Sequence, residues 1–376
     1  MSDPRLLRVT YQHPPGAPAL RVDLALVEVL GSDPRFDGFG GRKKIKELLE
    51  LGQIRLEEGR KVKPSHTLGE GTHHFELSLE VLKAQASRHT KLPLEWAKEY
   101  SGPEIEILYQ SAEWVVLNKP SGIPSIPHQW EDTSSCVHFF LKQFPESLNI
   151  GRGGLESGIL HRLDTGTSGC LVFARTSAAF DQLLQTWKNA PDDPIRPGVR
   201  KTYRAVGGIG GLTPSNPPTE TEPAGLGKRK STIEVLRNLE SLRLPYEIRT
   251  KIGHDLKSGK KMRAIQLEER DLSRIRGKAL PTLSRLLQVQ VVRHESDHLL
   301  IDLTLEIETG VMHQIRVHCA QVLHLPLLGD LTYGGPQAER LHLHAWKITL
   351  PDSSSQGRIT IEAPLPKQWP SAPSGV

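Results

Sequence analysis

An acidic residue in a polar loop is the strongest candidate for chemistry in this chain. Residues 158–175 read GILHRLDTGTSGCLVFAR, which is an apolar approach, a loop of small polar residues and an apolar return strand. Asp164 lies at the centre of this loop, and the glycines after it leave room for a ligand to approach closely. A carboxylate with many hydrogen-bonding neighbours can serve as an acid, a base or a nucleophile. The alternative is structural, in which Asp164 only caps a tight turn.

Histidines are frequent in the C-terminal third and raise the question of a metal site. They are His313, His318, His324, His342 and His344. A zinc motif on a helix needs two histidines four residues apart on one face. His313 and His318 are five residues apart, about 500° around a helix, so they do not share a face. We therefore predict that the protein holds no metal.

Strand-like segments surround the Asp164 loop and are expected to position it. WVVLN at 114–118 is a continuous apolar run, and LVFAR at 171–175 returns from the loop. LLIDLTLEIE at 299–308 alternates apolar and polar residues, which is typical of a half-buried strand, and LLQVQVV at 286–292 is also strand-like. The Pro-rich stretch at 213–231 is expected to be a loop-like insertion, because prolines remove backbone donors.

The N-terminal part has a different pattern, in which two helices are followed by hairpin-like strands. RVDLALVEVL from residue 21 predicts the first helix, and RKKIKELLELGQIRL from residue 42 predicts the second helix and its glycine turn. Four cations stand at the start of the second helix: Arg42, Lys43, Lys44 and Lys46. Cations at a helix N-terminus oppose its dipole, so this cluster suggests an external anion such as a phosphate. The alternative is an ordinary solvated helix face.

Composition sets the broad class. The chain has 376 residues, enough for two or three domains, and 48 Lys and Arg against 43 Asp and Glu give a net charge of +5, which weakly favours a polyanionic partner. The three cysteines form no CxxC pair. The N-terminus lacks the basic and apolar order of a secretory signal, and no window is apolar enough to span a membrane. We expect a cytoplasmic, monomeric protein that does not bind membranes.

The Asp164 loop resembles the signature of the RluA family of pseudouridine synthases. HRLD followed by TSG matches the family's catalytic string, and further segments follow in the family's order between residues 105 and 366. They are NKPSGIP at 118–124, RKTYRAVGGI at 200–209 and LEIETGVMHQIRVHCAQVLHLPLLGDLTYGG at 305–335. Where the family commonly reads TGRTHQIR, this chain has Val311 and Met312, which removes one basic residue near the pocket.

The resemblance implies the site residues and the reaction. Asp164 corresponds to the catalytic aspartate, Tyr203 to the tyrosine over the target base and Arg316 to the basic partner of the aspartate. The reaction changes the link between uracil and ribose from nitrogen to carbon and needs no cofactor. Asp164 would attack the anomeric carbon or take a proton from the neighbouring ribose carbon, and both routes need an ionised carboxylate. We expect Arg316 to hold it through a bidentate pair.

Further residues are expected to contact the RNA. Arg162 is the candidate to fill the space left by a flipped uridine, with His161 as a second contact. The remaining candidates lie in the segments that match the family: Asn118, Lys119, Thr167, His313 and Gln314.

The N-terminal pattern resembles the S-four RNA-binding domain, in which two helices and a strand present a basic surface. The insertion GSDPRFDGFGG before the basic helix departs from that pattern. We predict an α+β protein in which the pseudouridine synthase domain has a large mixed or antiparallel sheet with a central cleft, and the S-four-like domain is small and α/β. The expected boundaries are an N-terminal extension at 1–20, the S-four-like domain at 21–80, a linker at 81–104, the synthase domain at 105–366 and a tail at 367–376.

The expected substrate is a uridine in structured RNA. Ribosomal RNA is favoured over transfer RNA, because the two-domain arrangement resembles the large-subunit enzymes. Two other functions stay open. One is a non-catalytic RNA-binding or chaperone protein on the same fold. The other is a glycoside hydrolase, which would need a second acid beside Asp164, and Glu156 is the nearest one in this region.

Overall fold

The chain forms two units with separate hydrophobic cores. The computed structural model describes residues 6–32, 42–50, 52–78, 99–127, 132–152, 154–193, 198–210, 232–269, 272–295, 298–351, 357–367 and 369–370. One core is built from residues between Val9 and Leu77, and the others from residues between Ile105 and Trp369. We call residues 6–78 the N-terminal unit and residues 99–370 the C-terminal unit. The expected insertion at 213–231 and most of the expected linker lie outside the described residues.

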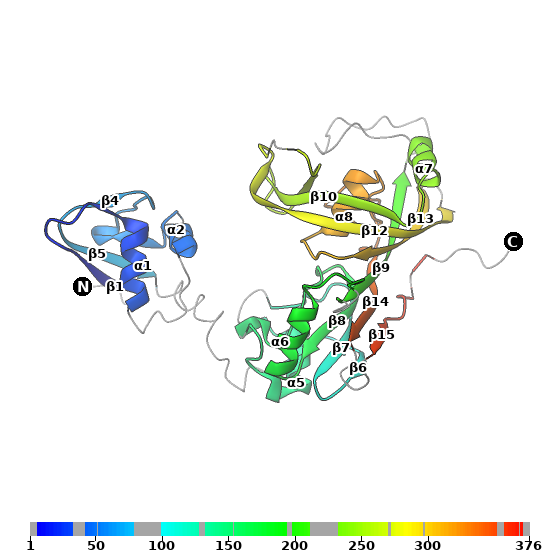
Figure 1. Ribbon diagram of the computed structural model, residues 1–376, viewed down its shortest axis with the longest axis horizontal. Helices are drawn as coiled ribbons and strands as arrows, with labels where there is room; N and C mark the ends of the chain where they lie inside the picture. Colours follow the sequence, from blue (N-terminus) through cyan, green and yellow to red (C-terminus); the bar gives the residue numbers. More distant parts are fainter. Residues whose placement is uncertain are drawn as a thin grey trace.

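In the N-terminal unit, two helices pack on a three-stranded sheet of order β1-β5-β3. Both predicted helices are confirmed, and their apolar faces contribute Leu26 and Leu48 to the core, together with Phe75 of the sheet. The elements are β1 Leu6–His13, β2 Leu20–Arg21, α1 Val22–Ser32, α2 Arg42–Glu50, β3 Ile54–Leu56, the 3-10 turn Glu57–Gly59, β4 Thr67–Leu68 and β5 Gly71–Ser78 (Figure 1).

The boundary expected at residue 20 was wrong. Leu6–His13, which was expected to be an extension, is strand β1 and pairs antiparallel with the whole of β5, from Leu6 opposite Ser78 to His13 opposite Gly71. The side chains of Val9 and Tyr11 alternate into the core. This strand therefore belongs to the N-terminal unit.

The C-terminal unit is built on a ten-stranded mixed sheet, so the α+β prediction with a large sheet is confirmed. The strand order is β11-β10-β12-β13-β9-β14-β8-β7-β6, and β15 pairs with β14. The strands are β6 Ile107–Gln110, β7 Trp114–Lys119, β8 Ser168–Ala174, β9 Arg200–Gly210, β10 Tyr246–Asp255, β11 Met262–Ile265, β12 Ile275–Glu295, β13 His298–Ile307, β14 Leu343–Pro351 and β15 Arg358–Glu362. The helical segments are α5 Cys136–Gln143, Pro145–Ser147, Gly154–Glu156, α6 Ser177–Thr186, α7 Thr232–Glu240, α8 Gln314–Val317 and His318–Val322.

Strands β7 and β8 are buried on both faces, which explains why their sequences are apolar throughout. Leu117 and Phe173 share a core with Phe140 of α5, whereas Val116 and Val172 share another with Phe180 of α6. Figure 1 shows α5 and α6 beside these strands. Ser135 and Thr176 cap the two helices by accepting hydrogen bonds from the N–H groups of His138 and Ala179.

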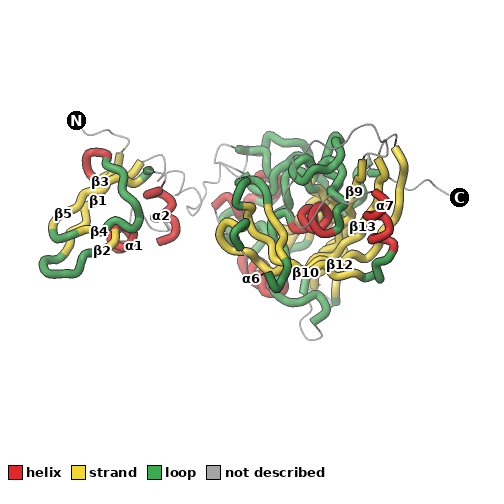
Figure 2. The backbone as a smooth tube through the Cα atoms, turned by 90° about the horizontal axis from the view of Figure 1, so that it is seen from above, coloured by secondary structure: helices red, strands yellow, loops and turns green. Residues whose placement is uncertain are grey.

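The other half of the sheet is antiparallel. Strands β9, β13, β12 and β10 lie side by side (Figure 2). The 21-residue β12 pairs with β10 through residues 275–286 and with β13 through residues 284–295. β14, from the end of the chain, lies between β8 and β9 and runs parallel to β8, with His344 opposite Ser168. Within the described residues, no helix has the length and apolar character needed to cross a membrane.

Candidate active site

Asp164 stands at the start of a tight turn that leads into β8. The turn, residues 164–168, is closed by the N–H of Thr167, which donates to the carbonyl oxygen of Asp164 at 2.9 Å. Before it, the N–H of Leu163 donates to Ser125 Oγ at 2.9 Å, and the same hydroxyl donates back to the Leu163 carbonyl at 2.7 Å. Both backbone groups of the residue before Asp164 are thus held by one side chain. We call these five residues the 164–168 turn.

Lys119 lies beneath the 164–168 turn, and the structure corrects the expectation that it contacts RNA. Its side chain is fully buried, and Nζ donates to the carbonyls of Pro120, Thr165 and Thr167 at 3.0, 3.0 and 2.7 Å. All three N–H groups of the ammonium are therefore used. Burial lowers the pKa of Lys119 to about 8, partly offset by the charges of Cys136 and Asp164. Lys119 is a positioning residue that holds the turn against β7.

Arg316 of α8 contacts Asp164, but not through the bidentate pair that we expected. Its Nη1 donates to Asp164 Oδ2 at 2.9 Å. The bidentate pair is with Asp330, because Nε and Nη2 donate to its two carboxylate oxygens at 2.7 and 2.8 Å. Burial alone would lower the pKa of Arg316, but the hydrogen bonds and charges of Asp330 and Asp164 raise it above its ordinary value. Asp330 is buried, whereas the Asp164 side chain is 27% exposed.

His313 and Tyr333 form a second contact layer around Asp164. His313 Nε2 is 3.7 Å from Asp164 Oδ2, and His313 Nδ1 is 2.9 Å from the Tyr333 hydroxyl, which accepts from the N–H of Met262 at 2.8 Å. Burial lowers the pKa of His313, although the Asp164 charge acts in the opposite direction. A neutral His313 that accepts from Tyr333 carries its proton on Nε2, facing Asp164. The ring of Tyr333 also lies 5.3 Å from the Arg316 guanidinium.

Tyr203 lies on β9 with its side chain buried in the main core. Burial raises the pKa of Tyr203, and the Asp164 charge raises it further. The phenol is therefore protonated at neutral pH.

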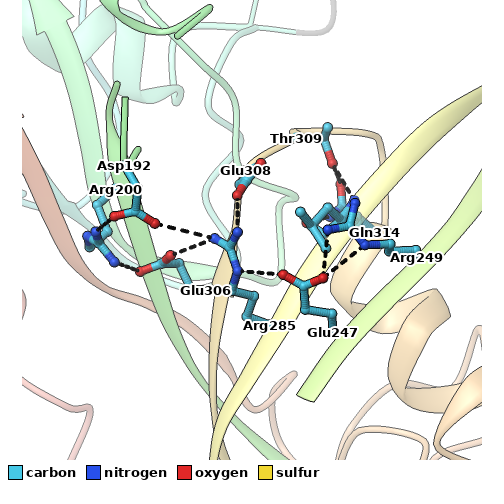
Figure 3. Close-up of polar contacts among 10 residues, drawn as sticks. Asp192, Arg200, Glu247, Arg249, Arg285, Glu306, Glu308, Thr309 and Gln314 are labelled. Carbon is cyan, nitrogen blue, oxygen red and sulfur yellow. Dashed lines mark hydrogen bonds and ion pairs between the residues drawn. The ribbon is translucent and has the colours of Figure 1, made fainter. Parts of the chain in front are cut away.

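Gln314 is a buried residue that positions the loop carrying His313, and the expectation of an RNA contact was wrong. Its Nε2 donates to the Leu283 carbonyl and to Ser284 Oγ, and its Oε1 accepts from the Thr309 hydroxyl at 2.8 Å. A ladder of ion pairs connects residues of β9, β13, β12 and β10 with Glu308, at the start of the same loop. Figure 3 shows the ladder, which consists of Asp192, Arg200, Glu306, Arg285, Glu308, Glu247 and Arg249.

Arg162 and His161, both predicted to contact RNA, differ in their surroundings. Arg162 is exposed, at 62% of its side chain, and its Nη1 is 3.7 Å from Glu156. His161 is stacked on Trp187 with ring centroids 4.8 Å apart, and its Nε2 accepts from the N–H of Val172. Burial lowers the pKa of His161 to about 3, and the Lys201 charge contributes.

Two further candidates have roles in the fold. Thr167 is buried, and its backbone closes the 164–168 turn and accepts from Lys119. Asn118 Nδ2 donates to Glu106 Oε2 at 2.9 Å. Neither contact joins these two side chains to Asp164.

The basic helix α2 has an internal anion that the sequence analysis missed. Asp23 of α1 is fully buried and receives Arg21 Nε at 3.0 Å, Arg42 Nε at 2.9 Å and Lys46 Nζ at 3.6 Å. Burial would raise the pKa of Asp23, but its hydrogen bonds with Arg42 and Arg21 outweigh this and lower it. Among the described side chains of this cluster, three cations share one carboxylate, which leaves a surplus of positive charge there. The side chains of Lys43 and Lys44 lie outside the described part.

Comparison with protein families identifies the C-terminal unit. Residues 113–321, more than half of the chain, match the family described as RNA pseudouridylate synthase. The chain belongs to this family. The match contains the 164–168 turn, Tyr203 and Arg316, and it ends before Asp330 and Tyr333. Among the described residues of this family member, no three His, Cys, Asp or Glu side chains are grouped as metal ligands.

Three individual proteins similar to this family member share between 21% and 28% of its residues over the matched part. Ribosomal large subunit pseudouridine synthase D of Neisseria meningitidis is 28% identical over 276 residues, which cover 70% of this chain and 58% of the relative. An uncharacterized RNA pseudouridine synthase of Synechocystis is 28% identical over 270 residues, 70% of this chain and 67% of the relative. The solved structure of human RNA pseudouridylate synthase domain containing 1 is 21% identical, covers 71% of this chain and 87% of its own, and has a TM-score of 0.47. This chain thus spans less than two thirds of the Neisseria relative.

Asp330 and Tyr333 were not among the predicted site residues. They lie in GDLTYGG, at the end of the segment whose resemblance to the family was noted. That segment was the available signal, but only the structure shows that Asp330 holds Arg316 and that Tyr333 contacts His313.

Proposed function

We propose that this protein is an RNA pseudouridine synthase that converts uridines in structured RNA to pseudouridine, with Asp164 as the catalytic residue. The observation that carries the proposal is the pairing of a partly exposed carboxylate, Asp164, with a buried arginine that a second carboxylate orients. Arg316 favours the ionised form of Asp164 and leaves one side of the carboxylate open. The family membership supports the same reaction.

The reaction breaks the bond between uracil N1 and the ribose anomeric carbon and forms a bond from C5 of the same base. The proton on C5 is lost to solvent, and N1, freed from the ribose, takes up a proton, so the product is an isomer of the substrate. The Asp164 carboxylate either attacks the anomeric carbon or removes a proton from the adjacent ribose carbon, and Arg316 orients it for both. Tyr203 offers its ring as a stacking face for the base, and its protonated hydroxyl can donate a hydrogen bond but is a poor base.

Access to a paired uridine requires that the nucleotide leaves its helix. Arg162 is the side chain that fills the space, because it is exposed, planar and two residues before Asp164. His161 is already stacked on Trp187, so we assign the stacking role to Arg162 alone.

The substrate class that we propose is ribosomal RNA, with transfer RNA as the alternative. The names of several relatives, which are ribosomal large subunit enzymes, support this choice. The N-terminal unit is proposed to be S-four-like and to hold structured RNA through the cations around Asp23. We further propose a monomer that acts in the cytoplasm, in keeping with the three cysteines being unpaired. Light scattering of the purified chain tests the monomer.

The decisive experiment measures tritium released from RNA labelled at uracil C5. Ribosomal and transfer RNA fractions are incubated separately with the wild type, Asp164→Asn and the control Asp181→Asn, which removes an exposed carboxylate on α6. We expect release by the wild type and the control from ribosomal RNA, and a loss of at least about 10³-fold for Asp164→Asn. Release of free uracil would instead indicate a hydrolase, and RNA binding without release would indicate a non-catalytic protein.

A further inference from the structure

Arg340 is a second arginine at the 164–168 turn, and the reaction described above does not use it. It lies just before β14, and its Nη2 donates to Ser168 Oγ at 2.6 Å while its Nε donates to the carbonyl of Leu341 at 3.2 Å. Arg316 contacts the first residue of the turn, Asp164, and Arg340 contacts the last one. The turn therefore has one guanidinium at each end.

A chain of buried hydrogen bonds fixes the orientation of Arg340. His344 Nε2 is 3.2 Å from the carbonyl of Ala363, and His344 Nδ1 is 2.8 Å from Ser168 Oγ. Burial lowers the pKa of His344 to about 4, so the ring is neutral. With its proton on Nε2, the ring accepts a hydrogen bond from the Ser168 hydroxyl at Nδ1. Ser168 Oγ can then accept a hydrogen bond from Arg340. One edge of the guanidinium is thereby held.

No carboxylate of the described residues balances the charge of Arg340. In the described part of the chain it forms no ion pair with a carboxylate, and its other N–H groups have no partner there, although the side chain is only partly exposed. Burial lowers the pKa of Arg340. Among the described residues, the contacts at the turn involve three cations, Lys119, Arg316 and Arg340, and two carboxylates, Asp164 and Asp330. A partly buried guanidinium with free N–H groups and surplus charge is suited to an external anion.

We propose that Arg340 binds a phosphodiester group of the RNA strand that carries the target uridine; this inference rests on the proposed function. Asp164 must meet the ribose of that nucleotide, and the strand's next phosphates lie within a few ångströms of the ribose. A guanidinium at the other end of the same turn is placed to receive one of them. Its free N–H groups match the bidentate geometry of phosphate oxygens. Arg340 would set the position of the strand, while Arg316 sets that of the carboxylate.

The first test measures RNA binding without turnover. A fluorescent oligouridine of about 12 nucleotides is titrated with Asp164→Asn, with Asp164→Asn/Arg340→Gln, and with Asp164→Asn/Arg358→Gln, from about 50 to 200 mM KCl. Arg358 is a matched control, because it loses the same charge on β15, where its Nη2 donates to the carbonyl of Gly198. We expect the slope of log affinity against log salt to fall by about 0.7 for Arg340→Gln only. An unchanged slope for Arg340→Gln would overturn the proposal.

The second test uses chains that keep Asp164 and separates binding from folding. For Arg340→Gln we expect KM for ribosomal RNA to rise about 5- to 20-fold with kcat within about threefold, and for Arg340→Lys a smaller rise, because the charge stays but the fork is lost. Thermal unfolding of each variant identifies any loss of fold. If Arg340→Gln does not fold, the KM of Arg340→Lys is the test of the proposal. If the wild type releases tritium and both variants keep its KM, the phosphate site is wrong while the proposed function stands. If the wild type neither binds RNA nor releases tritium, the proposed function itself fails.

Discussion

The two units each contain a buried carboxylate that organises cations, but they use it differently. In the N-terminal unit, Asp23 receives Arg21, Arg42 and Lys46, whose side chains are 41–43% exposed. In the C-terminal unit, Asp330 takes both N–H groups on one edge of Arg316, and the remaining Nη1 reaches Asp164. The first carboxylate anchors cations that face solvent, and the second orients a cation toward another carboxylate. The consequence is that Asp330 leaves Asp164, the carboxylate to which we assign the reaction, partly exposed and paired with an oriented arginine.

The largest effect that distinguishes the two carboxylates is expected from Asp330→Asn. Asp330 offers one oxygen to Arg316 Nε and the other to Nη2, whereas in Asn one of these acceptors becomes an NH2 donor. Arg316 therefore loses its orientation, and Asp164 loses its partner. We expect the single-turnover rate of tritium release to fall about 10²-fold. Asp23→Asn is the matched change in the other unit and is expected to raise KM instead. A rate for Asp330→Asn within about threefold of the wild type would show that the orientation of Arg316 does not matter.

As pH falls, the C-terminal unit should lose stability at a higher pH than the Asp23 cluster does. His318 is fully buried between Ser284, Thr250 and Thr282, and burial lowers its pKa to about 4, against about 6.5 when unfolded. The unfolded chain therefore binds the proton first, and the stability from neutral His318 is lost as pH falls from 6.5 toward 4. We expect protonation linked to His318 to lower the free energy of unfolding by about 2 kcal/mol between pH 7 and pH 5.

Urea unfolding followed by tryptophan fluorescence measures this loss in the C-terminal unit, since residues 6–78 contain no tryptophan. In the control His318→Asn, the side chain at this position does not titrate. Its free energy of unfolding should therefore fall by about 2 kcal/mol less between pH 7 and pH 5 than that of the wild type. Equal losses for both proteins would contradict the role of His318. The Asp23 cluster should hold through this range, because the pKa of Asp23 is lowered.

The smallest effect is expected from removing one cation of the Asp23 cluster, and it should appear in the affinity for RNA. Arg42→Gln should weaken binding of structured RNA about threefold and reduce the salt slope by less than one unit. Arg8→Gln is the control, because Arg8 lies on β1 of the same unit and forms an ion pair with Glu76 outside the Asp23 cluster. Equal effects of the two changes, measured by fluorescence anisotropy, would mean that the cluster around Asp23 is not the RNA surface.

Local patterns in the sequence predicted the strands, the two N-terminal helices and the position of Asp164 in a polar loop. They failed where a side chain's partner lies far along the chain. Lys119 and Gln314 were predicted to contact RNA because they lie in segments that resemble the family, but their partners are the carbonyls of Thr167 and Leu283. Strand β1 was missed because its partner, β5, begins almost sixty residues later. Spacing alone does not reveal such contacts.

The place of β14 in the sheet determines when the site forms during synthesis. Asp164 and Arg316 are separated by 152 positions, and Ser168 and His344 by 176. The strands β8 and β9 are consecutive in the chain, yet β14 lies between them. A growing chain that has already made Asp164 and Tyr203 therefore cannot join them in the finished sheet until residues 343–351 have emerged. The ribosome must therefore synthesise the chain through residue 351 before the sheet that carries the Asp164 site can be complete.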